Sequence, residues 1–540
     1  MNDINTETKI ESPRTIRRDR TNKEIEQKKT PIMAVILWIL SVFTVETLLK
    51  SGFGLTTPIL TGIYIVFLFW YYRDEKKSWK QILLAVSTFL VSLSLIITYN
   101  PVTYFITFWF LLYLVPTLAV SISGFSQGKL FSLGKIGGII TGCIGKTFLY
   151  LEAPMAILNK SNKNSGFKVI VGIIAALPIG AIFIGLFNSA DAVFKVSLDN
   201  LLESLNFDIW SIFGDLFFGT IIAIFLIAMH LGLKVENKRL EKEGFHQNWF
   251  DNTIVTTYFA VLVPIYALFI VIQFKYLFTT GAVLPGNISY SQYAVSGFYQ
   301  LCSIVSISSL MIIFALAFTK KVEGRYRISL KTVLTLLILG NFVIVTSAFF
   351  RMFKYIGVYD LSVKRLIVSW IITVIVFILL GIIVKIWKSD FPVLSYVGVM
   401  ICFMILILNF SNVNMIVGEY NVGKYIESDF KKELDLDYLA ELGPGAVGAT
   451  ARLLEEDAPD KALYLSVMTQ QKYLALEKNW RNMTVDNIGS RKYFEEYNIG
   501  GYKTNSDPKE YNYDIINEFD DYGFNMEGLN KEGKNRNEYK

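Results

Sequence analysis

The stretch that decides the fold is LIVSWIITVIVFILLGIIVKI, residues 366–386. It holds one charged residue, Lys385, near its end. A helix needs about 20 mainly apolar residues to cross the roughly 30 Å hydrocarbon layer of a bilayer, and only closed backbone hydrogen bonding is tolerated there. This stretch is therefore predicted to be a membrane-spanning α-helix.

Ten further segments have a similar length and apolar character. With 366–386 included, the predicted spans are approximately 32–49, 55–72, 81–98, 102–122, 167–187, 209–232, 253–274, 297–319, 331–350, 366–386 and 392–410. The composition agrees, because only 18% of the 540 residues are charged, below the quarter expected of a soluble chain. We expect an all-α fold, a polytopic transmembrane helical bundle of about 11 spans with a C-terminal soluble helical domain.

The charged residues divide the chain into four regions. Residues 1–31 are predicted to be a disordered cytoplasmic tail and residues 32–410 the transmembrane helical domain. Residues 411–497 are predicted to be the soluble helical domain, and residues 498–540 a partly disordered tail.

Basic residues predict the sidedness of the bundle. With the N-terminus in the cytoplasm, the inner segments carry 28 Lys and Arg residues and the outer loops carry 7. This bias favours a multi-pass protein of the cell membrane with a cytoplasmic N-terminus and, because eleven is odd, an extracytoplasmic C-terminal domain. The alternative rests on segment 134–151, GKIGGIITGCIGKTFLYL, whose crossing would reverse every later loop. We interpret it as a half-buried or interfacial helix whose regularly spaced glycines favour helix packing.

Ionisable residues within or beside the spans are candidate functional residues, because charge is costly in a bilayer. Glu46 lies near the outer end of the first predicted span and Asp215 in the outer part of the sixth, where local pairing is the alternative explanation. Asp191 lies at the start of an outer loop, 188–208, whose apolar spacing predicts an amphipathic helix on the membrane plane.

The predicted outer loop 351–365, RMFKYIGVYDLSVKR, is basic and aromatic. It supplies the remaining candidate residues: Arg351, Lys354, Tyr355, Tyr359 and Arg365. An aromatic belt at headgroup level is one interpretation of this loop. Contact with an anionic partner, either lipid headgroups or the acidic C-terminal domain, is the other.

The C-terminal domain is predicted to contain short amphipathic helices. One covers 428–442, opens at a Ser428 cap and stops at the glycines and proline of 443–445. Others are predicted at about 446–456 and 459–480.

Motifs of the common enzyme classes are missing from the sequence, including the P-loop, GxSxG, HExxH and kinase signatures. Three dispersed cysteines and two histidines do not form a metal-ligand pattern. We therefore predict no catalytic, cofactor-binding or metal-binding residue and no cofactor. The net charge of +6 is spread over loops and indicates membrane topology rather than nucleic-acid binding.

Three stretches resemble a family of uncharacterised bacterial membrane proteins, DUF4173/DUF4153. They are NSADAVF at 188–194, the basic-aromatic stretch 351–365, and the run that begins NVNMIVGEYNVGKYI at Asn412. The second is similar to a family pattern R-M-x-x-Y-I-x-x-Y-G-L-[ST]-x-x-R, with Asp360 in place of the glycine. The resemblance covers about residues 30–480 and implies a polytopic membrane protein without an assigned activity.

We expect a non-enzymatic envelope protein whose outward-facing helical domain binds a partner or senses a signal. The alternatives are a transporter or permease, and a membrane enzyme acting on lipid-linked substrates. The expected partners are the lipid bilayer and either an envelope protein or an anionic lipid.

Overall fold

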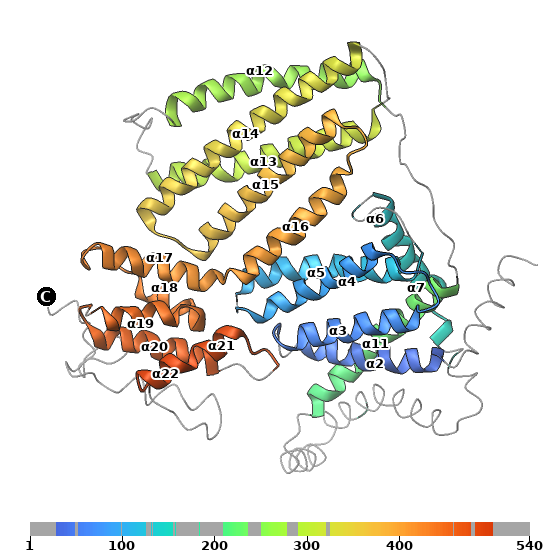
Figure 1. Cartoon of the computed structure of the whole chain (residues 1–540), viewed down its shortest axis with the longest axis horizontal. Coiled ribbons are helices and arrows are strands. Elements are labelled where there is room, and N and C mark those ends of the chain that lie inside the picture. The colour runs from blue at the N-terminus through green and yellow to red at the C-terminus, as the bar shows by residue number, and fades with distance from the viewer. Residues whose placement is uncertain are drawn as a thin grey trace, which may run out of the picture. The chain divides into compact units, whose positions relative to one another are not determined.

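The structure is a computed structural model. It describes residues 29–48, 52–98, 100–125, 131, 133–154, 157, 183, 209–235, 250–277, 290–319, 325–456, 458–476 and 481–499. Regular structure within these residues is helical, as Figure 1 shows. The all-α prediction is confirmed for this part of the chain.

The described residues before Ser411 include ten mainly apolar helices. They are α2 (Lys29–Glu46), α3 (Thr56–Tyr71), α4 (Trp79–Leu93, extended by a 3₁₀ turn at Ser94–Ile96), α5 (Pro101–Ile122), α11 (Ile209–Val235), α12 (Asn252–Leu277), α13 (Tyr290–Phe318), α14 (Arg325–Tyr359), α15 (Val363–Trp387) and α16 (Val393–Phe410). Nine of these described helices are long and apolar enough to cross a bilayer, and α3 is shorter, with 16 residues. The chain is a multi-pass membrane protein, and the predicted fifth span, 167–187, lies outside the described residues except for Phe183.

Segment 134–151 forms a helix in three pieces. These are α6 (Leu133–Ile139), a π-helical turn (Ile140–Gly145) and α7 (Lys146–Leu149). A Cβ at Gly142 would lie 3.1 Å from the Leu233 side chain and 3.2 Å from that of Phe125. The segment thus packs where α5 and α11 finish.

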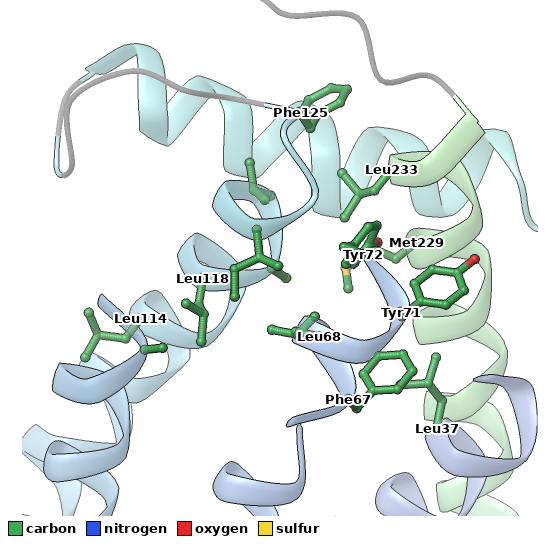
Figure 2. Packing of buried hydrophobic residues seen from close by; sticks show 14 of the residues in the cluster. Leu37, Phe67, Leu68, Tyr71, Tyr72, Leu114, Leu118, Phe125, Met229 and Leu233 are labelled. Carbon is green, nitrogen blue, oxygen red and sulfur yellow. The ribbon is translucent and has the colours of Figure 1, made fainter. Parts of the chain in front are cut away.

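The chain divides into two compact units, each with its own packing. Unit 1 comprises residues 1–411 and 479–484, and unit 2 comprises 412–478 and 485–540. Unit 1 contains two apolar cores. The first joins α2–α5 with α11 and is seen closely in Figure 2, which draws Phe67 and Tyr71 of α3 together with Leu37 of α2 and Met229 of α11. The second joins α12–α15 with the start of α16.

Polar contacts at one end of the first core fix the directions of its helices. Lys77 Nζ donates to the carbonyl of Tyr72, which follows α3, at 2.7 Å, and to that of Ile122, the last residue of α5, at 2.9 Å. Lys234 Nζ, near the end of α11, lies 3.3 Å from Asp74 Oδ2. Helices α3, α5 and α11 therefore all finish at this end, which we call the basic end.

The other end of these helices is marked by a buried amide. Asn409 Nδ2 in α16 donates to Ser94 Oγ at 2.8 Å and to Thr107 Oγ1 at 2.9 Å. Ser94 follows α4 and Thr107 lies in the first half of α5. Thus α16 finishes at the end opposite the basic end.

Unit 2 is also helical. It contains α17 (Val413–Glu427), α18 (Leu436–Glu441), a 3₁₀ turn (Gly443–Ala446), α19 (Val447–Glu455), α20 (Lys461–Leu476), α21 (Val485–Gly489) and α22 (Arg491–Glu496). Helices α19 and α20 correspond to the predicted segments 446–456 and 459–480.

The predicted helix 428–442 is wrong. Ser428 closes α17 instead of opening a helix, and the next two residues, Asp429 and Phe430, have φ of 53° and 60°. Such left-handed backbone ends a helix. Asp435 caps the short helix α18 by accepting a hydrogen bond from Tyr438 N at 2.9 Å.

The predicted loop 351–365 is mostly helical, which corrects the prediction. Helix α14 continues to Tyr359, and Ser362 caps α15 by accepting a hydrogen bond from Arg365 N at 3.3 Å. Only residues 360–362 connect the two helices. The candidate residues of this stretch therefore lie on the ends of a helical hairpin.

Candidate functional site

Glu46, the last residue of α2, forms an ion pair with Arg481. The Arg481 carbonyl accepts a hydrogen bond from Thr56 N, at the start of α3, at 3.1 Å. A Cβ at Gly54 would lie 2.5 Å from the Asn482 backbone, so this close approach depends on glycine. Residues 481–484, which we call the strap, are thereby held against the connection between α2 and α3.

The strap has an unusual place in the chain. By its contacts it belongs to unit 1, although the helices before and after it, α20 and α21, belong to unit 2. Sequence patterns alone could not pair Glu46 with Arg481, because the two residues are 435 positions apart and neither lies in a motif. The local explanation proposed for Glu46, pairing near an interface, agrees with this ion pair.

Arg365 organises the tip of the α14–α15 hairpin. Its guanidinium carbon lies 4.4 Å from the ring centroid of Tyr355 and 6.0 Å from that of Tyr359. Its Nη1 donates to the carbonyls of Tyr359 and Asp360 at 2.5 and 2.6 Å. Since these carbonyls lie at the end of α14, Arg365 caps that helix with a charge that its dipole favours.

The other candidate residues have separate surroundings. Arg351 is buried within α14, whereas Lys354, one turn later, is exposed. Asp215 is buried in α11. Asp191 and the predicted amphipathic helix 188–208 lie outside the described residues. The structure thus joins Tyr355, Tyr359 and Arg365 in one cluster and gives Glu46 a partner elsewhere.

The sequence analysis missed His230, which is fully buried in α11. Tyr64 Oη lies 3.1 Å from its Nε2, and Tyr72 Oη lies 2.9 Å from its Nδ1. Tyr64 lies in α3, 166 residues before the histidine, and Tyr72 is the C-cap of α3, 158 residues before it. The signal that could have found this site was a lone histidine in an apolar span.

One arrangement of hydrogens satisfies every group of this network. Tyr72 Oη also lies 3.2 Å from the His230 carbonyl, to which its hydroxyl donates. The same hydroxyl then accepts from Nδ1–H, so Nε2 is left to accept from Tyr64. A neutral His230 therefore has both ring nitrogens satisfied, and the network fastens α3 to α11.

An ionic cluster lies beside this network at the basic end. Asp74 lies 3.1 Å from Lys29 Nζ and 3.3 Å from Lys234 Nζ. The hydrogen bond from Lys29, followed by that from Lys234, holds the pKa of Asp74 below its usual value. Lys234 also lies over the rings of Tyr71 and Tyr72, at 5.6 and 5.9 Å. This cluster links the start of α2 to the finish of α3 and α11.

In the described part of the chain, neither the cavities nor the potential metal-ligating side chains indicate a catalytic or metal-binding site. A narrow space between α13, α14 and α15 has no room for a water molecule and is lined by aliphatic residues and Cys302. A groove between α12 and α14 is also mainly apolar. The described residues contain no group of three potential metal-ligating side chains.

The comparison with known families identifies the chain. The family described as "Domain of unknown function (DUF4153)" matches residues 85–453, which is more than half of the sequence. The chain belongs to the DUF4153 family. The match confirms the resemblance for DUF4153 and not for the DUF4173 name. The matched region of this DUF4153 protein runs from α4 to α19 and includes His230 and the α14–α15 hairpin.

The family name assigns no activity to these residues. Neither a curated protein nor a solved structure matches this DUF4153 chain. Its function has to be argued from its own residues.

Proposed function

We propose that this DUF4153 protein is a non-enzymatic envelope protein whose C-terminal helical unit lies outside the cell membrane and there binds a partner or senses a signal. The observation that carries the proposal is the strap. A binding event that moves α20 or α21 acts on residues 481–484, which are held by Glu46 and Thr56 at the ends of α2 and α3. The strap is covalently continuous with unit 2 and is held by the membrane helices through an ion pair and a hydrogen bond.

Charge and helix direction support the proposed sidedness. Helix α2 begins with Lys29 at the basic end and finishes at Glu46, which holds the strap. The basic end also carries Arg73 and Lys77, and the positive-inside rule therefore favours the cytoplasm for it. Helix α16, which directly precedes unit 2, finishes at the opposite end, and this supports an extracytoplasmic unit 2.

Parity supports the interfacial interpretation of segment 134–151. Because α5 and α11 both finish at the basic end, the sequence between them has to cross the membrane an odd number of times. The single predicted crossing at 167–187 meets this requirement, and a second crossing at 134–151 would break it. Contacts of Gly142 with Phe125 and Leu233 favour the same interpretation.

Cysteine labelling tests the sidedness. Cys143, Cys302 and Cys402 are replaced by serine, and one cysteine is introduced at Asp437, an exposed residue of α18. A membrane-impermeant maleimide should label Asp437→Cys in intact cells. Lys76→Cys, exposed at the basic end, is the matched control and should react only after lysis. The reverse pattern contradicts the outward assignment.

Site-specific photocrosslinking in cells tests partner binding. A photoreactive residue is placed at exposed positions of unit 2, Glu441 and Glu495, and at Lys76 as the control. We expect a discrete envelope-protein adduct from unit 2 and none from Lys76. Solute uptake by purified protein in liposomes would support a transporter instead. A changed lipid or polymer profile in Arg351 and Arg365 variants would support a membrane enzyme.

A further inference from the structure

Unit 2 exposes large apolar side chains that a soluble domain normally buries. Met415 of α17 is 49% exposed, Leu476 of α20 57%, and Val485 and Ile488 of α21 49% and 56%. Tyr473, three residues before Leu476, is 50% exposed. We call these five residues the apolar patch.

Two hydrogen bonds bring the helices of the apolar patch together. Asn412 Nδ2, at the cap of α17, donates to Asp486 Oδ1 of α21 at 2.6 Å. Asn487 Nδ2 donates to the carbonyl of Ala475, next to Leu476, at 3.4 Å. The start of α17, the end of α20 and the whole of α21 therefore meet in one region of unit 2.

The polar residues of α21 face into this region and the apolar ones face out. Asp486 and Asn487 are 9% and 4% exposed, whereas the residues on either side of them, Val485 and Ile488, are about half exposed. Residues three apart lie on one side of a helix, so Val485 and Ile488 share a face, as do Tyr473 and Leu476. The sequence has thus placed apolar side chains outward on two neighbouring helices.

The chain ties the apolar patch to the ends of membrane helices at two points. Val485 directly follows Thr484 of the strap, so their Cα atoms are about 3.8 Å apart. Met415 is five residues after Phe410, the last residue of α16, and can lie at most about 18 Å from it. Both points of attachment are at the end of the bundle where Glu46 lies.

We propose that the apolar patch is a membrane-contact surface, which seats unit 2 on the phospholipid bilayer around the bundle. At the boundary between headgroups and acyl chains, aliphatic side chains leave water and a tyrosine keeps its hydroxyl hydrated. Arg491 and Lys492, exposed on α22 directly after α21, supply cations for lipid phosphates beside the patch. This inference does not depend on which side of the membrane unit 2 occupies.

Fluorescence quenching by lipids tests the membrane-contact surface. The full-length chain without native cysteines carries one environment-sensitive fluorophore, at Ile488→Cys or Leu476→Cys, and is placed in nanodiscs whose lipids bear a quencher in the upper acyl chain. We expect at least twofold quenching at both positions and a blue-shifted emission. Lys461→Cys is the matched control, because it is exposed at the other end of α20, about 22 Å from Leu476, and should stay unquenched.

Three outcomes would overturn the inference. Water-like emission without quenching at Ile488 and Leu476 would mean that the patch is free in solution. Blue-shifted emission without lipid quenching, lost when each nanodisc holds one chain, would assign the patch to a second copy. Equal quenching at Lys461 would mean that the patch lies no closer to lipid than the far end of α20, so it would not be the membrane-contact surface.

Discussion

Asp360 adopts a backbone conformation that glycine tolerates better than a residue with a Cβ atom. It has φ of 63°, in the left-handed region where a Cβ is unfavourable, and it stands where the resembling family pattern has glycine. Its carbonyl, which accepts from Arg365, is kept by any substitution. We expect Asp360→Gly to be more stable than Asp360→Ala by about 1 kcal/mol in denaturant titrations in mixed micelles. Since both variants remove the carboxylate, equal stability would contradict the backbone explanation.

The Arg365 side chain stabilises the tip of the α14–α15 hairpin. A lysine at this position keeps the charge but loses the planar group that stacks on Tyr355 while reaching two carbonyls. We expect Arg365→Lys to lower the free energy of unfolding by about 1–3 kcal/mol in the same titration. The adjacent Lys364 is exposed, so Lys364→Ala should change the free energy of unfolding by less than about 0.5 kcal/mol. A larger loss at Lys364 than at Arg365 would refute this role.

At the scale of elements, the His230 network joins α3 to α11. Removing one hydroxyl leaves a buried imidazole nitrogen without its hydrogen bond, which costs about 1–3 kcal/mol. We expect Tyr72→Phe and His230→Leu to be coupled by about 1 kcal/mol in a double-mutant cycle of unfolding free energies. Tyr258→Phe, in an exposed position of α12, serves as the control and should show no coupling to His230→Leu. Additive effects of Tyr72 and His230 would show that the network does not fasten the helices.

Glycine at one position allows α2 and α11 to approach closely. A Cβ at Gly219 would lie 2.7 Å from the Cα of Val42, and backbone atoms cannot move aside as a flexible side chain can. We expect Gly219→Ala to destabilise the protein by about 1–3 kcal/mol. Gly137→Ala is the matched control, because open space surrounds its Cβ position and alanine is the better helix former. In thermal unfolding in detergent, the midpoint temperature of Gly137→Ala should therefore equal or exceed that of the native chain, and that of Gly219→Ala should be lower.

The sequence predicted the membrane helices well because length and apolarity are local properties. Hydropathy placed the end of a span at residue 350, yet α14 continues through the buried Arg351 to Tyr359, since helical hydrogen bonding does not end where polarity begins. Ser428 was read as an N-cap, although the left-handed residues after it make it the end of α17. Both errors concern the ends of helices, which the local sequence pattern determines less well than the presence of a helix.

The sites were harder to predict than the spans. Glu46 was singled out because charge within or beside a span is costly, and Arg365 because its predicted outer loop is basic and aromatic. The structure gives each a specific partner. The partners themselves are long-range: Arg481 is 435 residues from Glu46, and Tyr72 is 158 residues from His230. Hydropathy and motif spacing carry no information over such distances, so the strap and the His230 network could only come from the fold.

At the scale of the whole molecule, the position of the segment 133–149 decides whether this segment is itself the crossing between α5 and α11. Tyr150, which follows it, would lie 2.9 Å from a Cβ at Gly232, near the end of α11, and the Lys146 ammonium lies 5.6 Å from the ring centroid of Phe125. These contacts hold both the middle and the end of the segment at the basic end. If the segment were a crossing helix, one of these two contacting residues would have to lie about 30 Å from the basic end.

Labelling at Glu152 can distinguish a crossing segment from one held at the basic end, because Glu152 is exposed and lies two residues after Tyr150. We expect Glu152→Cys, in the chain without native cysteines, to react with a membrane-impermeant maleimide only after lysis, as Lys76→Cys does. Labelling of Glu152→Cys in intact cells, with Lys76→Cys still protected, would mean that the segment crosses. Parity between α5 and α11 would then demand an even number of crossings between Glu152 and Ile209, and the predicted span 167–187 could not stand alone. A crossing at 134–151 in place of the predicted span 167–187 would keep the count of eleven, and the shared direction of α5 and α11 would also remain.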